Sequence, residues 1–171
     1  MPKSALSLWP STIRPSIKSP ATILAAQAKE LALQTDGALV GELKSRDSED
    51  SKQTVHTLDV YAPALDYRHR VLTATHAKSQ IYPVLVDAEM FRPRSFAEVI
   101  NQAGTLSGAF GAPPAKRENE ATSDDELIEL VKRVLNSPQV VAVAISLIAK
   151  AEEIIEQQKE TGDGVPSPAS E

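Results

Sequence analysis

The feature that most constrains this chain is an alternation of apolar and polar side chains in two neighbouring stretches. In residues 55–61 the side chains change character with a period of two, which is the repeat of a β-strand with one buried face. Residues 67–76 continue the pattern, with threonine and tyrosine positions suited to a pleated surface. Only Pro63-Ala64-Leu65-Asp66 separates the two stretches. Such a short link predicts antiparallel strands, because a parallel connection needs a long crossover.

Two further stretches complete the predicted sheet. Residues 39–45 precede the pair and are joined to it by a polar turn, and residues 81–86 follow it. Pro83 lies inside the last stretch and has no N–H to donate to a neighbouring strand, so we predict that this strand lies at the edge of the sheet. The sequence therefore predicts an antiparallel β-meander of three to four strands.

Helix-start signals lie on both sides of these strands. Ser19 is followed by Pro20, which suits the first position of a helix because its missing N–H has no partner there. Residues 95–98 and 123–126 both have the pattern of a capping box, and Ser137-Pro138 repeats the first signal. We therefore predict an α+β fold in which an N-terminal helix and C-terminal helices pack the meander.

The predicted helix over residues 140–149 is apolar on every side. A helix of this composition has to be buried, either in the core or at a contact between subunits. We expect helices over residues 21–35 and 124–136 to enclose it together with the sheet, or a second copy of the chain to complete the enclosure. Ile145 is predicted to be buried.

The remaining segments define the domain organisation. Residues 1–19 are predicted to form an extended arm, and residues 20–158 a single α+β domain. Within that domain the glycine-rich and polar stretch of residues 104–122 is interpreted as a flexible linker, with a lid as the alternative. Residues 159–171 are rich in Gly, Pro, Ser and Glu, which is typical of a disordered tail.

Composition excludes several classes of function. The net charge of −5 and an aromatic content of 4% argue against nucleic acid, which is bound by basic surfaces and aromatic platforms. The chain has no cysteine, and hence no disulfide and no thiolate zinc site, which fits a reducing cytoplasm. The longest apolar run is too short to span a membrane. The glycines lack the Gly-Lys-Ser/Thr ending of a phosphate loop, so we expect no cofactor.

Polar residues in the central hairpin are the candidates for chemistry. If residues 63–66 form the turn, Asp59 lies opposite or near His69, and a carboxylate beside an imidazole orients a general base or supports a metal ligand. An ordinary cross-strand pair is the favoured interpretation. His56 and His76 would serve as ligands only if they converge, and no short spacing brings any two of the three histidines together. We therefore predict no metal site and leave their convergence open.

Four arginines form the second candidate group. Arg68 and Arg70 flank His69, and Arg92 and Arg94 follow the last predicted strand. Arginine matches a carboxylate or phosphate with two parallel donors, so together they are candidates for binding an acidic group. The favoured interpretation is that they face solvent on a half-exposed sheet.

No motif in the sequence defines an activity or a known family. We expect a non-enzymatic interaction or regulatory module that binds a protein partner or a second copy of itself, without nucleic acid or membrane. An immunity protein or an antitoxin is one concrete form of this role. The alternative is a small hydrolase or ligand-binding domain that uses His69, Asp59 and the arginines. Convergence of those residues in a cleft would favour the alternative, and an exposed Val/Ile helix would favour the binding module.

Overall fold

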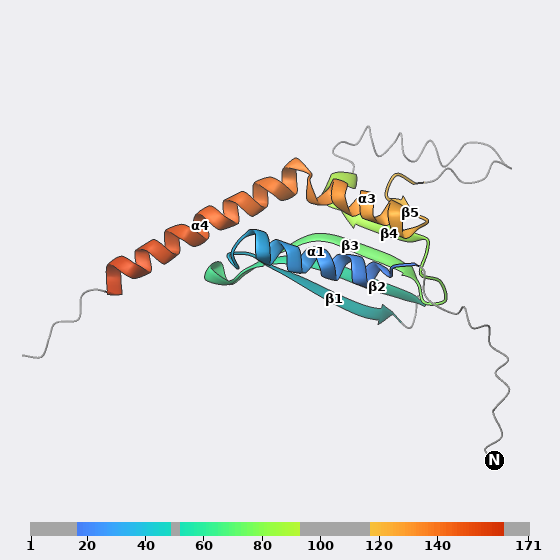
Figure 1. Cartoon of the computed structure of the whole chain (residues 1–171), viewed down its shortest axis with the longest axis horizontal. Helices are drawn as coiled ribbons and strands as arrows, with labels where there is room; N and C mark the ends of the chain where they lie inside the picture. The colour runs from blue at the N-terminus through green and yellow to red at the C-terminus, as the bar shows by residue number, and fades with distance from the viewer. Residues whose placement is uncertain (1–16, 49–51, 93–116, 163–171) are drawn as a thin grey trace, which may run out of the picture.

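The computed structural model describes residues 17–48, 52–92 and 117–162, with the backbone alone for residues 158–162. It has the predicted α+β class: one helix, an antiparallel sheet and two C-terminal helices (Figure 1). The described elements follow in the order α1 (Pro20–Gln34), β1 (Val40–Ser48), β2 (Gln53–Ala62), the 3₁₀ turn η1 (Pro63–Leu65), β3 (Tyr67–Ala77), β4 (Val84–Ala88), the 3₁₀ turn η2 (Glu89–Phe91), β5 (Glu120–Ala121), α3 (Asp124–Leu135) and α4 (Pro138–Gly162).

The sheet is an antiparallel meander in the order β1-β2-β3-β4-β5. The four strands expected from the sequence are confirmed, with η1 as the turn between β2 and β3. The prediction that the fourth strand lies at the edge is wrong. β4 begins at Val84, after Pro83, and its second side pairs with β5 through Val84 opposite Ala121 and Leu85 opposite Glu120. The proline therefore removes no hydrogen bond from the sheet, and β5 lies inside the stretch interpreted as a linker.

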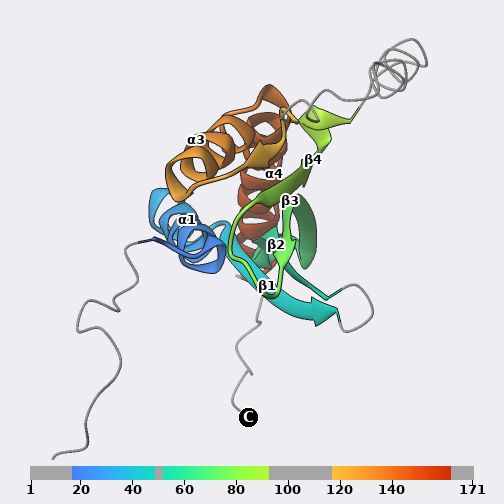
Figure 2. The same cartoon turned by 90° about the vertical axis from the view of Figure 1, so that its right-hand side faces the viewer.

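Helices α1 and α3 cover one face of the sheet (Figure 2). The core between them is built from aliphatic side chains of both layers, and its largest fully buried members are Leu24, Leu39, Leu72, Leu127, Val84, Val86, Val131 and Val134. Gly41 of β1 sets how closely α1 approaches, because a Cβ at this position would lie 2.4 Å from Ala28 Cα. No side chain fits between the two backbones here.

The predicted helix starts of α1 and α3 are confirmed. Ser19 Oγ accepts a hydrogen bond from the Thr22 N–H at 3.2 Å, and Ser123 Oγ accepts one from the Glu126 N–H at 3.3 Å. Each cap satisfies an N–H that the helix itself leaves without a partner. The inward side of α3 consists of Leu127, Leu130, Val131 and Val134, all of which are buried.

Helix α4 begins at its predicted cap, where Ser137 Oγ accepts from the Val140 N–H at 3.4 Å. It is bent by 54° from α3 and contacts η1 and β2. Leu147 and Ala151 are buried on its inner side, but Ile145 is 62% exposed, so the prediction that this helix is enclosed by the fold is wrong. The reason is its path: α4 runs along one margin of the domain and beyond it, where only one side meets other described elements (Figure 1).

Several predictions fall on residues outside the described ranges. These are most of the N-terminal arm of residues 1–19, the capping box at residues 95–98, Arg94, residues 104–116 of the linker, and residues 163–171 of the tail. The backbone of α4 continues to Gly162, into the stretch interpreted as the tail.

Candidate functional site

The face of the sheet that α1 and α3 do not cover, called the open face here, carries an ionic cluster on strands β1, β2 and β3. Glu42 of β1 lies directly opposite Asp59 of β2, and the two carboxylates share Lys44, whose Nζ is 3.4 Å from Glu42 and 3.6 Å from Asp59. Arg68 Nε lies 3.1 Å from Glu42, and Arg70 Nε lies 3.6 Å from Asp59. The positive charges of these three side chains offset the repulsion between two carboxylates that lie opposite one another across the strands.

Within this cluster Asp59 is buried and its Oδ1 accepts no hydrogen bond, with Arg70 Nε at 3.6 Å as its ion-pair partner. The hydrogen bond from Arg68 lowers the pKa of Glu42 below its usual value. Arg68 also lies over the Tyr61 ring, with its guanidinium carbon 4.1 Å from the ring centroid. Because both arginines already have carboxylate partners, they are less free to bind an outside acidic group.

The register does not bring Asp59 and His69 together. A bulge between Leu58 and Asp59 places Arg70 opposite Asp59, and it places His69 opposite Val60. Adjacent residues of a strand point to opposite faces, so His69 points to the helix-covered side and Asp59 to the open side. Arg92 pairs instead with Asp87, with 3.4 Å between Nη2 and Oδ2. The cluster proposed from sequence therefore separates into different places.

The structure does bring two histidines together, on the helix-covered face. His56 of β2 and His76 of β3 have their Nε2 atoms 3.2 Å apart, with ring centroids 5.3 Å apart and ring planes 28° from parallel. His56 Nδ1 lies 2.7 Å from Ser45 Oγ, and His76 Nδ1 lies 2.9 Å from the Ala77 carbonyl oxygen. We call Ser45, His56 and His76 the histidine cluster.

A carbonyl oxygen only accepts hydrogen bonds, so His76 Nδ1 carries a proton and donates it to Ala77. With both rings neutral, His76 Nε2 then accepts from His56 Nε2, and Ser45 Oγ donates to His56 Nδ1. Burial lowers the pKa of His56 below its usual value, and the charge of His76 lowers it further, against an opposing effect of Asp47. A protonated His56 would be poorly solvated here, so the environment favours the neutral ring.

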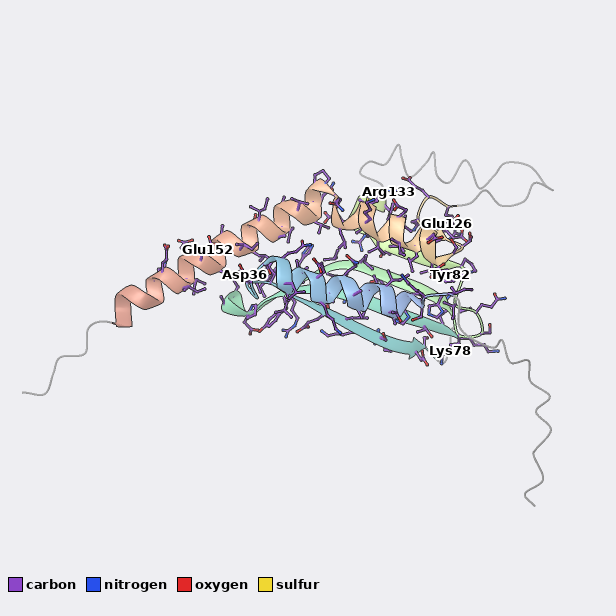
Figure 3. All side chains as sticks on the ribbon, viewed as in Figure 1. Asp36, Lys78, Tyr82, Glu126, Arg133 and Glu152 are labelled. Carbon is purple, nitrogen blue, oxygen red and sulfur yellow. The ribbon has the colours of Figure 1, made fainter. Side chains whose placement is uncertain are left out.

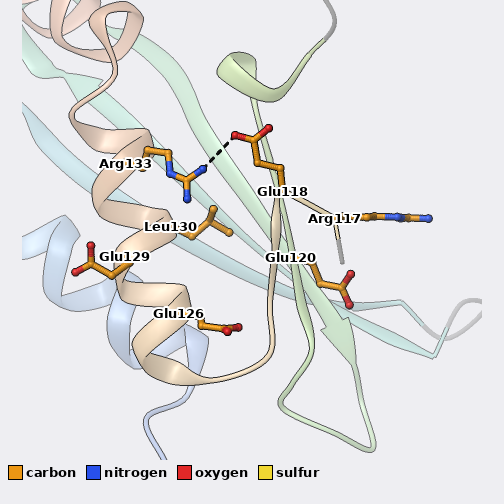
Figure 4. A pocket seen from close by; sticks show the side chains of 7 residues that line it. All are labelled: Arg117, Glu118, Glu120, Glu126, Glu129, Leu130 and Arg133. Atoms are coloured by element: carbon orange, nitrogen blue, oxygen red, sulfur yellow. Dashed lines mark hydrogen bonds and ion pairs between the residues drawn. The ribbon is translucent and has the colours of Figure 1, made fainter. Parts of the chain in front are cut away.

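A hollow of about 330 Å³ lies between β5 and α3 (Figure 4). Leu130 is the one apolar residue among those that line it, and Arg133 Nη1 is 3.2 Å from Glu118 Oε1 across its rim. Ligand sites are mostly apolar with a few placed polar groups. A shallow, mainly acidic hollow of this kind does not match that pattern.

The outer side of α4 carries three of the large apolar side chains that are exposed in the described part of the chain. Its stripe consists of Val141, Ile145, Ile148, Glu152 and Ile155, at intervals of four, three, four and three residues. Val141 is 42% exposed, Ile145 62% and Ile155 45%, and Ile148 is partly buried. We call these five residues the outer stripe. The outer stripe lies away from the end of the sheet at which α1 and α3 begin. Tyr82 is labelled at that end in Figure 3.

Comparison with known proteins adds no assignment: no family model, no curated protein and no solved structure matches this chain. In the described part of the chain, no single helix is long and apolar enough to cross a membrane. Only α3 and α4 taken together, across their 54° bend, meet that length and composition.

Proposed function

We propose that this protein is a non-enzymatic interaction module that associates with a second copy of itself through the outer stripe of α4. The observation that carries the proposal is the exposure of Ile145, a large β-branched side chain 62% exposed in the middle of an apolar helix. Exposed apolar patches on folded domains mark surfaces that bind other molecules.

The spacing of the outer stripe favours a helix as the occupant. Intervals of four and three residues repeat every 3.5 residues on average, which keeps one seam facing a partner helix. The stripe covers two heptads, from Val141 to Ile155. This is too short for a long coiled coil, so we expect a short helix crossing. Ala142, Ser146 and Ala149 are small and exposed beside the stripe, which allows two backbones to approach closely.

The distribution of charge along α4 favours a second copy in antiparallel orientation. Residues 138–149 contain no charged side chain, whereas Glu152, Glu153 and Glu156 follow Lys150 in the other half. Two copies that cross near Ile145 bring their uncharged halves together, and their acidic halves point away from one another. A parallel pair would instead align Glu152 with Glu152 at an apolar seam. Anionic membrane surfaces are disfavoured as the occupant, because helices that lie on them carry basic polar faces.

A contact confined to half of one helix is small, and small interfaces form weak, transient complexes. We therefore expect an association that depends on protein concentration. Sedimentation equilibrium or light scattering over a concentration series should give a mass that rises from 18.4 kDa toward twice that value.

Two matched variants localise the contact. Ile145→Glu should keep the protein monomeric at every concentration, because it places a charge in the seam. Ile81→Glu changes another isoleucine, 45% exposed in the β3–β4 connection, and should associate like the wild type. A wild-type mass that stays at 18.4 kDa, or equal association by both variants, would refute the proposal.

The alternative of a hydrolase or ligand-binding domain has less support. It requires Asp59, His69 and the arginines to converge, whereas Asp59 and His69 lie on opposite faces of the sheet. Arg68 and Arg70 have carboxylate partners within the sheet itself.

A further inference from the structure

In the histidine cluster both imidazole rings are held in place through both of their nitrogens. The two Nε2 atoms lie 3.2 Å apart, within hydrogen-bonding distance, and each Nδ1 atom lies within hydrogen-bonding distance of an oxygen. His76 Nδ1 also lies 3.1 Å from the Gln80 carbonyl oxygen. The rings are thus fixed by β1 on one side and by the β3–β4 connection on the other.

The spacing of the two nitrogens fits a shared metal ion. Zinc binds imidazole nitrogen at about 2.0–2.1 Å in a tetrahedral arrangement, which sets two ligand nitrogens about 3.3 Å apart. The observed 3.2 Å lies within a few tenths of an ångström of that value. Histidines that bind metals also characteristically donate their other N–H to a carbonyl or a similar acceptor, and this fixes the ring and its tautomer. His76 has such a partner in Ala77, and His56 has one in Ser45 Oγ when its proton sits on Nδ1.

We propose that His56 and His76 form a two-histidine binding site for a divalent transition metal of the zinc, nickel and copper group. Both ligands are Nε2 atoms of neutral imidazoles, a donor type that suits these ions and not calcium or magnesium. Among the described residues no cluster of three or more His, Asp or Glu side chains is placed to hold a metal, so water or an incoming ligand fills the remaining positions. The Asp47 carboxylate, two residues from Ser45 on the same strand, is paired with Lys78 Nζ at 3.8 Å and accepts from Thr54 Oγ1, so we do not count it among the ligands.

Such an ion would tie β2 to β3, because each strand supplies one ligand. A metal that binds the folded chain and not the unfolded chain raises the stability of the fold in proportion to the logarithm of its concentration. The site lies on the sheet and not on α4, so this inference is independent of the proposed self-association.

The test is a titration of the untagged chain with ZnCl₂ and NiCl₂, followed by calorimetry and by thermal unfolding. We expect one ion per chain and an unfolding temperature that rises with metal concentration. His76→Gln should weaken binding by at least about tenfold, the scale on which lost ligand support acts in metal sites. His76 is the residue to replace because it is partly exposed, whereas His56 is buried and its loss would disturb the fold.

His69→Gln is the matched control, since His69 lies on the same strand and face but outside the cluster, and it should bind metal like the wild type. A second readout follows the imidazole resonances by NMR: zinc should shift those of His56 and His76 and leave those of His69 unchanged. The proposal is overturned if the wild type shows no saturable binding. It is also overturned if His76→Gln binds as tightly as His69→Gln, or if the His69 ring shifts as much as the other two.

Discussion

Helices α3 and α4 are neighbours in the chain, and each begins at a serine that caps it, yet they bury their apolar side chains to very different extents. α3 has a narrow stripe of four such residues, and all four are at most 3% exposed. α4 is apolar on every side over residues 140–149, but of its described side chains only Leu147 and Ala151 are buried. A helix rich in apolar side chains therefore needs burial, but its position relative to the sheet decides how much of that burial the domain itself provides.

The largest effect is expected on α3. Leu127→Ala should lower the free energy of unfolding by about 2–5 kcal/mol, because Leu127 is fully buried and its loss opens a cavity where α3 packs into the core. Urea denaturation followed by circular dichroism measures this. A loss below about 1 kcal/mol would mean that α3 is not part of the cooperative core.

The inner side of α4 should respond less strongly. Leu147→Ala is expected to cost about 2 kcal/mol, at the lower end for a buried leucine, since this site borders solvent and relaxes more easily. The same denaturation experiment gives the value. An effect as large as that of Leu127→Ala would show that α4 is packed into the core as firmly as α3.

Tyr82 reports on packing beside the start of α3. Its hydroxyl donates to the Lys18 carbonyl oxygen at 2.9 Å, and burial, together with the charges of Asp124 and Asp125, raises the pKa of Tyr82 to about 12. The folded state therefore keeps this proton after the unfolded state, with a pKa near 10, has lost it. The corresponding stability is complete below about pH 10 and is lost as the pH rises through 12.

Tyr82→Phe should cost about 1 kcal/mol at neutral pH, the net worth of one hydrogen bond. It should also remove the component near pH 12 from a spectrophotometric tyrosine titration. Tyr67→Phe, at a tyrosine that is 49% exposed, should leave that component in place. Persistence of the component in Tyr82→Phe would show that packing at this end of α3 is looser than described.

The smallest effect on folding is expected on the outer stripe. At concentrations where the chain is monomeric, Ile145→Ala should change the free energy of unfolding by no more than about 0.5 kcal/mol, as surface substitutions do. This replaces the large loss that the sequence pattern alone predicts for a buried Ile145. A loss of about 2 kcal/mol or more in dilute protein would mean that α4 packs on both sides within one chain.

The sequence predicts those parts of the fold that depend on local chemistry. The hairpin at Pro63–Leu65 follows from a period of two broken by a proline, and the starts of α1, α3 and α4 follow from serine caps. β5 has only two residues and so shows no period. It is held by pairing with β4, which a local pattern does not encode.

The candidate sites depend on register, and register is not local. The bulge at Leu58/Asp59 gives Asp59 an arginine as its opposite residue in place of the expected neighbour His69. His56 and His76 are 20 residues apart in sequence, and they meet only because His56 pairs with Ala74 while His76 is the next residue on the same face of β3. Both histidines lie within predicted strands, where every second residue points to the same face. With the exact register of β2 against β3, this pattern would have predicted that the two rings lie side by side.

Because the chain has no cysteine, a single engineered thiol can test directly whether the outer stripe of α4 is a contact between copies. In Ile145→Cys the single thiol would lie near the crossing of two α4 helices, and mild oxidation should join two chains into a disulfide-linked dimer that retains the fold. Ile81→Cys, with an isoleucine of comparable exposure replaced elsewhere, gives the rate of random collision. We expect Ile145→Cys to cross-link much faster than Ile81→Cys at protein concentrations at which the wild type associates. Equal rates for the two variants would contradict it.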